Sequence, residues 1–266
     1  MKRFMGRVEW VAVCPESELG LGVPREAISL ERTSGDLRLI ATQSRRDLTD
    51  AMRSWADARL DRLSGLCGFV LKARSPSCAV RSAPVVGDSV PHDGLWAAAV
   101  RARFPWMPLA DEAQVAAEGA AEHFLFQAEE CLRLNRLFEP PWQPRDLVEF
   151  HTGVKLLLLA HSPDAYRALG RLVAKPEFSA SFETEYRVQY MAALRQPPTP
   201  GRDANALAHA FGYFSEQLPV EERQAFAGRI DAVARGEAQP SPVKAQLLEH
   251  ARRLGYGYLL EQRYLY

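Results

Sequence analysis

The sequence lacks several features that would define a class of protein at once. No apolar run approaches the ~18 residues that a membrane-spanning helix needs, which argues against an integral membrane protein. The 33 Lys and Arg residues are balanced by 33 Asp and Glu residues, so the chain is not strongly basic like many nucleic-acid-binding proteins. With 47% apolar and 25% charged residues, the composition excludes a disordered, collagen-like or coiled-coil chain.

Cysteine is also scarce. The chain has four, Cys14, Cys67, Cys78 and Cys131, and none of them forms a CxxC pair. The spacing therefore gives no support to a zinc ribbon or a thioredoxin-like site. The N-terminal segment is basic, but it has neither the apolar stretch nor the cleavage site of a secretory leader. We expect a cytoplasmic protein with no membrane partner, whose cysteines are free thiols or ligands rather than disulfides.

Residues 1–109 have the pattern of an α/β domain. Val8–Cys14, Leu37–Thr42 and Gly68–Ala73 are short apolar segments of strand length. An amphipathic helix is expected to begin at Asp47–Thr49, and a further helix is expected over Gly94–Phe104. Strand, helix and strand in this order predict a parallel, Rossmann-like sheet.

The rest of the chain is predicted to be helical. Residues 110–144 are expected to form an acidic helical connector that ends at a proline-rich stretch. Residues 145–266 have the pattern of an all-α domain, with one helix over Asp146–Ala160 and another over Ser179–Arg195. Two Ser-Pro pairs, Ser162-Pro163 and Ser241-Pro242, are typical of helix starts.

Charge is distributed unevenly over these parts. The net charge is +4 over residues 1–109, −5 over residues 110–143 and +1 over residues 144–266. The overall neutrality is therefore a sum of unlike parts, which permits an RNA partner without requiring one.

Two cysteines are the first candidates for chemistry. Cys14 ends one predicted strand, and Cys78 follows another in a Ser-Pro-Ser-Cys turn. Because ligands bind at the carboxyl ends of parallel strands, these two thiols can converge on one point. The alternative is that each is a small buried apolar residue. Cys67 and Cys131 are expected to be structural.

Other polar pairs are weaker candidates. Arg25 and Glu26 follow the Cys14 loop, where a surface ion pair is the simpler interpretation. Lys155 belongs to a helix that leads to His161, and Asn205 and His209 share a helix face. Solvation or helix packing explains these positions equally well.

At this point the sequence resembles two known families. The stretches CPESELGLGVPRE (14–26), RRDLTDAM (45–52) and LCGFVLKARSPSC (66–78) are similar to the thiouracil desulfidase family. The stretches FHTGVKLLLLAHSPDAYRALGRLVA (150–174), NALAHAFGYF (205–214) and YLLEQRYLY (258–266) resemble the YbgA-type helical domain. In tandem they resemble bacterial enzymes that remove sulfur from 4-thiouridine in tRNA.

The resemblance implies a 4Fe–4S cluster held by three cysteine thiolates, with one iron open to the substrate sulfur. Cys14 and Cys78 match two of the three ligands. The matching loops also contain candidates for proton transfer and substrate positioning, which are Glu16, Arg25, Glu26, Ser75 and Ser77. In the helical domain the implied partner is tRNA rather than DNA, and the candidate contacts are Lys155, His161, Arg202, Asn205 and His209.

The chain departs from the family pattern at several positions. The family's first cysteine lies in an N-terminal strand that this chain lacks, so we expect the sheet to be one strand short and the cluster one ligand short. Ala79 stands where the family has Gly, and Asp203 where it has His. Two interpretations of these departures stay open: the start is mis-set and the protein is longer, or this copy is a degenerate, non-catalytic relative that keeps only an RNA-binding helical domain. A zinc or redox protein that uses Cys14, Cys67 and Cys78 is a further alternative, which the ligand spacing does not support.

Overall fold

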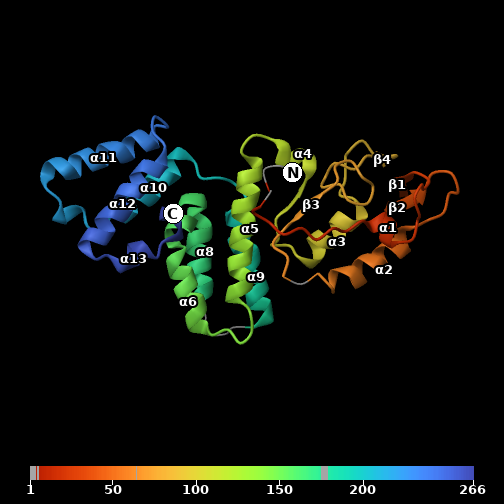
Figure 1. Cartoon of the computed structure of the whole chain (residues 1–266), viewed down its shortest axis with the longest axis horizontal. Coiled ribbons are helices and arrows are strands. Elements are labelled where there is room, and N and C mark those ends of the chain that lie inside the picture. Colours follow the sequence, from red (N-terminus) through yellow and green to blue (C-terminus); the bar gives the residue numbers. More distant parts are fainter. Residues whose placement is uncertain (1–3, 5, 64, 175–178) are drawn as a thin grey trace. The chain divides into compact units, whose positions relative to one another are not determined.

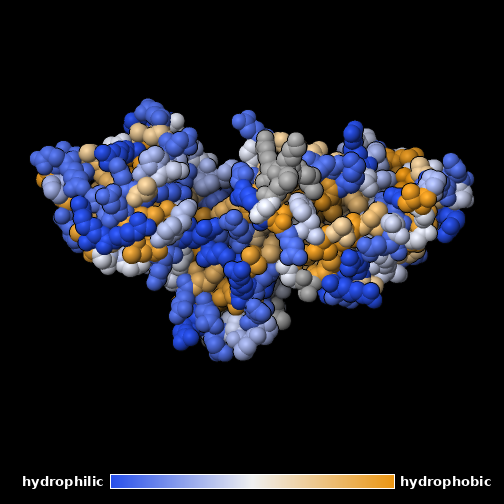
Figure 2. All heavy atoms as spheres, in the orientation of Figure 1, coloured by the Kyte–Doolittle hydropathy of each residue, from blue (hydrophilic) through white to orange (hydrophobic). Residues whose placement is uncertain are grey.

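The computed structural model describes residues 4, 6–63, 65–174 and 179–266 (Figure 1). The chain divides into two compact units, Met1–Arg133 and Leu134–Tyr266. The first unit contains the strands and the second is helical, as the sequence predicts for an α/β domain followed by an all-α domain. Within the described residues no helix is both long enough and apolar enough to cross a membrane, and the face drawn in Figure 2 intersperses hydrophilic with hydrophobic residues.

The first sheet is a mixed one. Strand β1 (Ile28–Thr33) pairs in antiparallel register with β2 (Asp36–Ala41), and β4 (Val85–Val86) lies parallel to β1 on its other side. The β1–β2 turn places Ser34 and Gly35 at φ +52° and +92°, the left-handed geometry that a tight two-residue hairpin requires.

The second sheet has two strands. Strand β3 (Phe69–Leu71) lies parallel to β5 (Leu109–Asp111), and helix α3 (Leu95–Arg103) belongs to the connection between them. Helix α3 packs against α2 (Thr49–Leu60), and the Trp55 and Trp96 ring centroids lie 4.9 Å apart. Burial of aromatic rings of this size is the main stabilising contribution in a small domain.

Short helices complete the first unit. Helix α1 (Pro15–Glu18) follows Cys14, and α4 (Glu112–Ala116) begins with a capping box at Asp111. Helix α5 (Ala120–Leu137) confirms the helix predicted in the acidic stretch, and the boundary between the two units falls within it.

Several predictions about the first unit are wrong in detail. Val8–Cys14 forms no strand, because no neighbouring chain provides a backbone ladder for these residues in the described structure. The strands predicted around Leu37 and Gly68 exist, but they belong to different sheets. Each of the two sheets contains one parallel pair, as predicted for an α/β domain. Strands β1 and β4 were not predicted.

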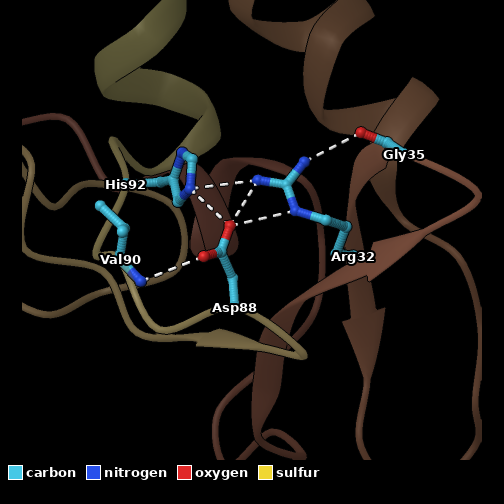
Figure 3. A network of polar contacts seen from close by, with 5 residues as sticks. All are labelled: Arg32, Gly35, Asp88, Val90 and His92. Carbon is cyan, nitrogen blue, oxygen red and sulfur yellow. Dashed lines mark hydrogen bonds and ion pairs between the residues drawn. The ribbon is translucent and has the colours of Figure 1, made fainter.

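An ion-pair network ties the loop after β4 to β1 (Figure 3). The Arg32 guanidinium donates to Asp88 Oδ2 from Nε at 3.0 Å and from Nη2 at 2.6 Å, and His92 Nε2 lies 3.0 Å from the same oxygen. The backbone N–H of Val90 also donates to Asp88. These hydrogen bonds hold the pKa of Asp88 well below its usual range, so the carboxylate is charged and fixes the loop that leads to α3.

The second unit contains the other helices of the described chain. They are α6 (Pro144–Gly153), α7 (Lys155–His161), α8 (Pro163–Val173), α9 (Ala180–Ala193), α10 (Pro200–Gly212), α11 (Val220–Ala234), α12 (Pro240–Leu254) and α13 (Gly257–Leu260). The Ser162 hydroxyl caps α8, as predicted. The prediction at Ser241 is wrong by two positions, because α12 already begins at Pro240.

The predicted single helix over Asp146–Ala160 is broken at Val154. The Gln262 side chain, which is fully buried, accepts a hydrogen bond from Leu156 N and donates one to Thr152 O. The side-chain amide of Gln262, remote in the sequence, thus forms hydrogen bonds with two backbone groups beside the break. Since a buried unpaired backbone group costs about as much as a lost hydrogen bond, these bonds make the interruption stable.

Candidate functional site

Cys14 lies at the start of α1 and is exposed. Pro15 at the first helical position favours this helix start, and Glu16 follows within the first turn. The Cys14 thiol contacts Glu16, with Sγ 3.7 Å from Oε2. A thiol and a carboxylate therefore form a pair on a short helical turn.

Arg25 lies against the same carboxylate. Its Nη2 is 3.9 Å from Glu16 Oε2, and the Glu16 side chain is only 12% exposed. At this distance Arg25 and Glu16 form an ion pair without a close hydrogen bond. Glu16 therefore lies between a thiol and a guanidinium.

Cys78 belongs to the loop that follows β3. The Ser75 hydroxyl accepts hydrogen bonds from the N–H groups of Ser77 and Cys78, both at 3.2 Å. This turn holds the Cys78 side chain in a buried position. Burial, followed by the negative charge of Glu16, raises the pKa of the Cys78 thiol to about 12, and Cys14 contributes in the same direction.

The structure brings the two thiol segments near each other, because Val13, the neighbour of Cys14, packs against the core cluster that contains Cys78, and Glu16 contacts the Cys14 thiol. The sequence predicted that the two thiols would converge, although through strand ends of one sheet. In the structure Cys14 instead lies at a helix start, and Cys78 follows a strand of the second sheet. We call these three residues together with Arg25 the thiol–carboxylate cluster.

The Ser75–Ala79 loop forms backbone hydrogen bonds with the N-terminal end of α3. The N–H of Trp96 donates to Ser77 O at 2.8 Å, and the N–H of Gly94 donates to Ala79 O at 2.8 Å. A Cβ atom at Gly94 would lie 2.3 Å from the Ser77 carbonyl carbon. Sequence reasoning missed this glycine, for which the only signal was its place before a predicted helix.

Ser77 is completely buried, and its hydroxyl oxygen has no hydrogen-bond partner. Buried hydroxyl groups are normally paired, and an unpaired one costs about 1–3 kcal/mol. Ser77 therefore lies next to Cys78 with an unused donor and acceptor. Its hydroxyl is available to a group that enters the loop.

Glu26 lies outside the thiol–carboxylate cluster. Its carboxylate accepts hydrogen bonds from Gln43 N, Ser44 N and Ser44 Oγ at 2.6–3.0 Å. The bonds from Ser44 lower the pKa of Glu26. These contacts are those of a residue that fixes the turn after β2.

Arg25 and Glu26 also line a surface pocket of about 580 Å³. The other lining residues are Leu19, Gly20, Leu21, Pro24, Ile28, Ala41, Gln43, Ser44, Arg46 and Leu48. Because Arg25 both lines the pocket and pairs with Glu16, the pocket adjoins the thiol–carboxylate cluster.

The other two cysteines lie elsewhere. The Cys67 thiol contacts Gly65 O at 3.7 Å, and Cys131 is buried in α5. Among the described residues no group of three or more His, Cys, Asp or Glu side chains is placed to hold a metal ion. The residues present thus do not fit a cluster that needs three thiolates, since they supply two.

Some of the residues predicted for RNA binding are buried in the helical unit, and others are exposed on it. His161 is buried, and its Nδ1 lies 2.8 Å from Gln196 O. Arg202 donates to His161 O at 2.9 Å. Lys155 begins α7 half-buried, while Asn205 and His209 are exposed on α10.

The geometry describes an α/β domain with a paired thiol site, followed by an all-helical domain. Residues 1–112 match the family model described as 2-thiouracil desulfurase, and residues 155–266 match the one described as a protein of unknown function (DUF1722). The uncharacterized protein YbgA of Escherichia coli (strain K12) is 34% identical over 120 residues, which cover 44% of this chain and 70% of that protein.

No solved structure matches the chain. The chain belongs to the YbgA (DUF1722) family, and its helical domain follows a domain of the 2-thiouracil desulfurase type. Both resemblances seen in the sequence are thereby confirmed. The desulfurase-type domain indicates a desulfurase-like role for the first unit.

Proposed function

We propose that the chain removes sulfur from a thiolated uracil, and that its substrate is 4-thiouridine in tRNA, which becomes uridine. The observation that supports this is the contact of Glu16 with the Cys14 thiol, next to Val13, which packs against the core cluster that contains Cys78. The reaction is a hydrolysis in which water adds to the thiocarbonyl carbon, the C–S bond breaks and sulfur leaves as hydrogen sulfide. No net oxidant or reductant is needed.

Glu16 is the proposed acid–base residue. Its carboxylate accepts a proton from the attacking water and returns it to the departing sulfur. A positioned acid or base of this kind contributes about 10²–10⁴-fold in rate. Arg25 and the hydroxyls of Ser75 and Ser77 are proposed to position the substrate, and Glu26 to hold the pocket wall.

The resemblance also implies a 4Fe–4S cluster, with Cys14 and Cys78 as two of its ligands. When bound, such a cluster offers a Lewis-acidic iron to the substrate sulfur. The third thiolate would have to come from outside the described site, so we assign no step to the cluster.

The helical unit is the proposed tRNA-binding part, with Lys155, Arg202, Asn205 and His209 as its contacts. His161 would act through Arg202, whose guanidinium it orients. The proposed domains are a desulfidase domain (1–109), a connector (110–144) and an RNA-binding domain (145–266). The proposed location of the protein is the cytoplasm. Flipping a modified base out of its stack costs a few kcal/mol, which binding of the tRNA body can offset.

The test is release of sulfide from tRNA that contains 4-thiouridine, with free 2-thiouracil as a second substrate. We expect uridine and sulfide in equal amounts from tRNA. Sulfide release from the free base but not from tRNA would overturn the tRNA assignment. No sulfide from either substrate, under anaerobic conditions with iron and sulfide supplied, would overturn the desulfidase proposal.

The incomplete thiol site favours a second candidate. A site that supplies two thiols among the described residues, where the family implies three, fits a non-catalytic relative that only binds RNA through its helical domain. Anaerobic reconstitution separates the two candidates. Bound iron that is lost in both Cys14→Ser and Cys78→Ser, but kept in the control Cys67→Ser, supports the desulfidase. RNA binding without iron or activity supports the second candidate.

A further inference from the structure

The exposed aromatic ring of Tyr213 lies at the C-terminal end of α10, on the polar face of this helix. Tyr213 is 47% exposed, although tyrosine has a large apolar ring. Its backbone stays helical, at φ −64° and ψ −30°, so that its side chain continues the face of α10. Such a ring offers an apolar surface to a partner at little conformational cost, since it has only two rotatable side-chain bonds.

The ring of Tyr258, in α13, stacks on one side of the Tyr213 ring. The two ring centroids lie 4.9 Å apart, with 27° between the ring planes. A hydrogen bond with Tyr213, after burial, raises the pKa of the Tyr258 hydroxyl, and Tyr166 of α8 acts in the same direction. The Tyr213 ring is therefore fixed by a neighbour from another helix, and its other side faces outward.

The same face of α10 carries a row of polar side chains. Arg202, Asn205, His209 and Tyr213 follow one another at intervals of three or four residues, and all are exposed. This spacing places them on one side of a helix over about 16 Å. In the described structure the side chains of Asn205 and His209 make no hydrogen bond or ion pair, so these polar side chains are open to a partner. We call these four residues the α10 stripe.

The charge of the α10 stripe points to an anionic partner. Arg202 uses one guanidinium nitrogen to hold His161 O and has the others left for a ligand. The one acid in this part of α10, Asp203, is engaged by the Tyr264 hydroxyl at 2.6 Å. A cation, two open polar groups and a flat aromatic ring in a row combine phosphate attraction with base stacking.

We propose that the α10 stripe binds a single-stranded segment of RNA, with Tyr213 as a stacking platform for one unpaired base. This inference rests on the proposed RNA-binding function of the helical unit and deepens it. Duplex RNA presents no free base face, so the platform selects loops and ends. Arg202 contacts the backbone phosphate, and Tyr258 acts as a positioning residue that holds the platform flat.

The experiment measures binding of the full chain to a tRNA over a range of salt concentrations. We expect Tyr213→Ala and Tyr213→Leu to weaken binding about 5- to 100-fold, because one stacked base is lost. Tyr213→Phe keeps the ring and should bind like the wild type. The salt slope should stay unchanged in these variants, whereas Arg202→Gln should lower it by about one.

A fully paired RNA duplex of equal length is the matched control. On the duplex, Tyr213→Leu should bind as well as the wild type. Tyr213→Leu also retains an apolar side chain against Tyr258, and its thermal unfolding should match that of Tyr213→Phe. A folded Tyr213→Leu variant with wild-type affinity for tRNA would overturn the platform and leave the RNA-binding function standing. Absence of tRNA binding by the wild type would overturn both.

Discussion

The Sγ atom of Cys14 lies 3.7 Å from Oε2 of Glu16, two residues further along the chain. The contact is local, because both residues belong to the start of α1. The same carboxylate also affects a residue remote in the sequence, because burial and then the negative charge of Glu16 raise the pKa of Cys78. Glu16 therefore contacts one thiol and affects the pKa of the other, and the proposed chemistry depends on this residue.

Glu16→Gln should remove the proton acceptor while leaving the shape of the site nearly unchanged. We expect kcat for sulfide release to fall about 10²–10⁴-fold, with little change in KM. Glu18→Gln is the matched control, because Glu18 belongs to the same short helix but pairs with Arg59 at 3.0 Å. Equal activity of the Glu16 and Glu18 variants would rule out Glu16 as the acid–base residue.

The two thiols should differ sharply in reactivity in the metal-free protein. Cys14 is exposed, whereas Cys78 is buried with a pKa raised to about 12, so at pH 8 only about one Cys78 side chain in 10⁴ is a thiolate. Iodoacetamide followed by mass spectrometry should label Cys14 and leave Cys78 unlabelled. Unfolding in urea should make both reactive. Rapid labelling of Cys78 in the folded chain would contradict its burial.

Gly94→Ala tests the seat of the Cys78 loop on α3. Its Cβ would lie 2.3 Å from the Ser77 carbonyl carbon, and backbone cannot yield cheaply, so we expect the free energy of unfolding to fall by about 1–3 kcal/mol. Gly228→Ala is the control, because nothing lies within 4 Å of its Cβ and alanine favours a helix interior. Chemical denaturation should show a loss for the first variant and none for the second.

The sequence predicted that Cys14 and Cys78 would approach each other at the ends of two strands of one sheet, but Cys14 lies at a helix start and the strands form two sheets. Strand pairing depends on partners that are remote in the chain, and β4 contains only two residues. The predicted strand at Val8–Cys14 has suitable residues, but it has no partner strand among the residues that the structure describes. Glu26 shows the same limit, since only the structure reveals that the turn at Gln43 and Ser44 uses its carboxylate.

The helical half was more predictable, because caps and apolar spacing are local signals. Ser162 caps α8 as expected. The break in the predicted Asp146–Ala160 helix depends on Gln262, more than 100 residues away, and no local pattern contains it. His161 was a candidate contact through the resemblance to the YbgA-type domain, and the local sequence does not reveal that packing buries it in the helical unit.

His151 should make the stability of the helical unit depend on pH. It is buried, its Nδ1 lies 3.1 Å from the Tyr186 hydroxyl, and burial followed by the charge of Lys155 lowers its pKa to about 4. In the unfolded chain His151 has a pKa of about 6.5, so it binds a proton before the folded chain does. The free energy of unfolding is therefore full above pH 6.5 and falls by about 3 kcal/mol as the pH drops towards 4.

Urea unfolding followed by circular dichroism should show this loss in the wild type and a smaller loss in His151→Gln, which retains a polar partner for Tyr186. His209→Gln, at an exposed position of α10, should behave like the wild type. Equal pH slopes for His151→Gln and the wild type would mean that the His151 proton is not linked to folding.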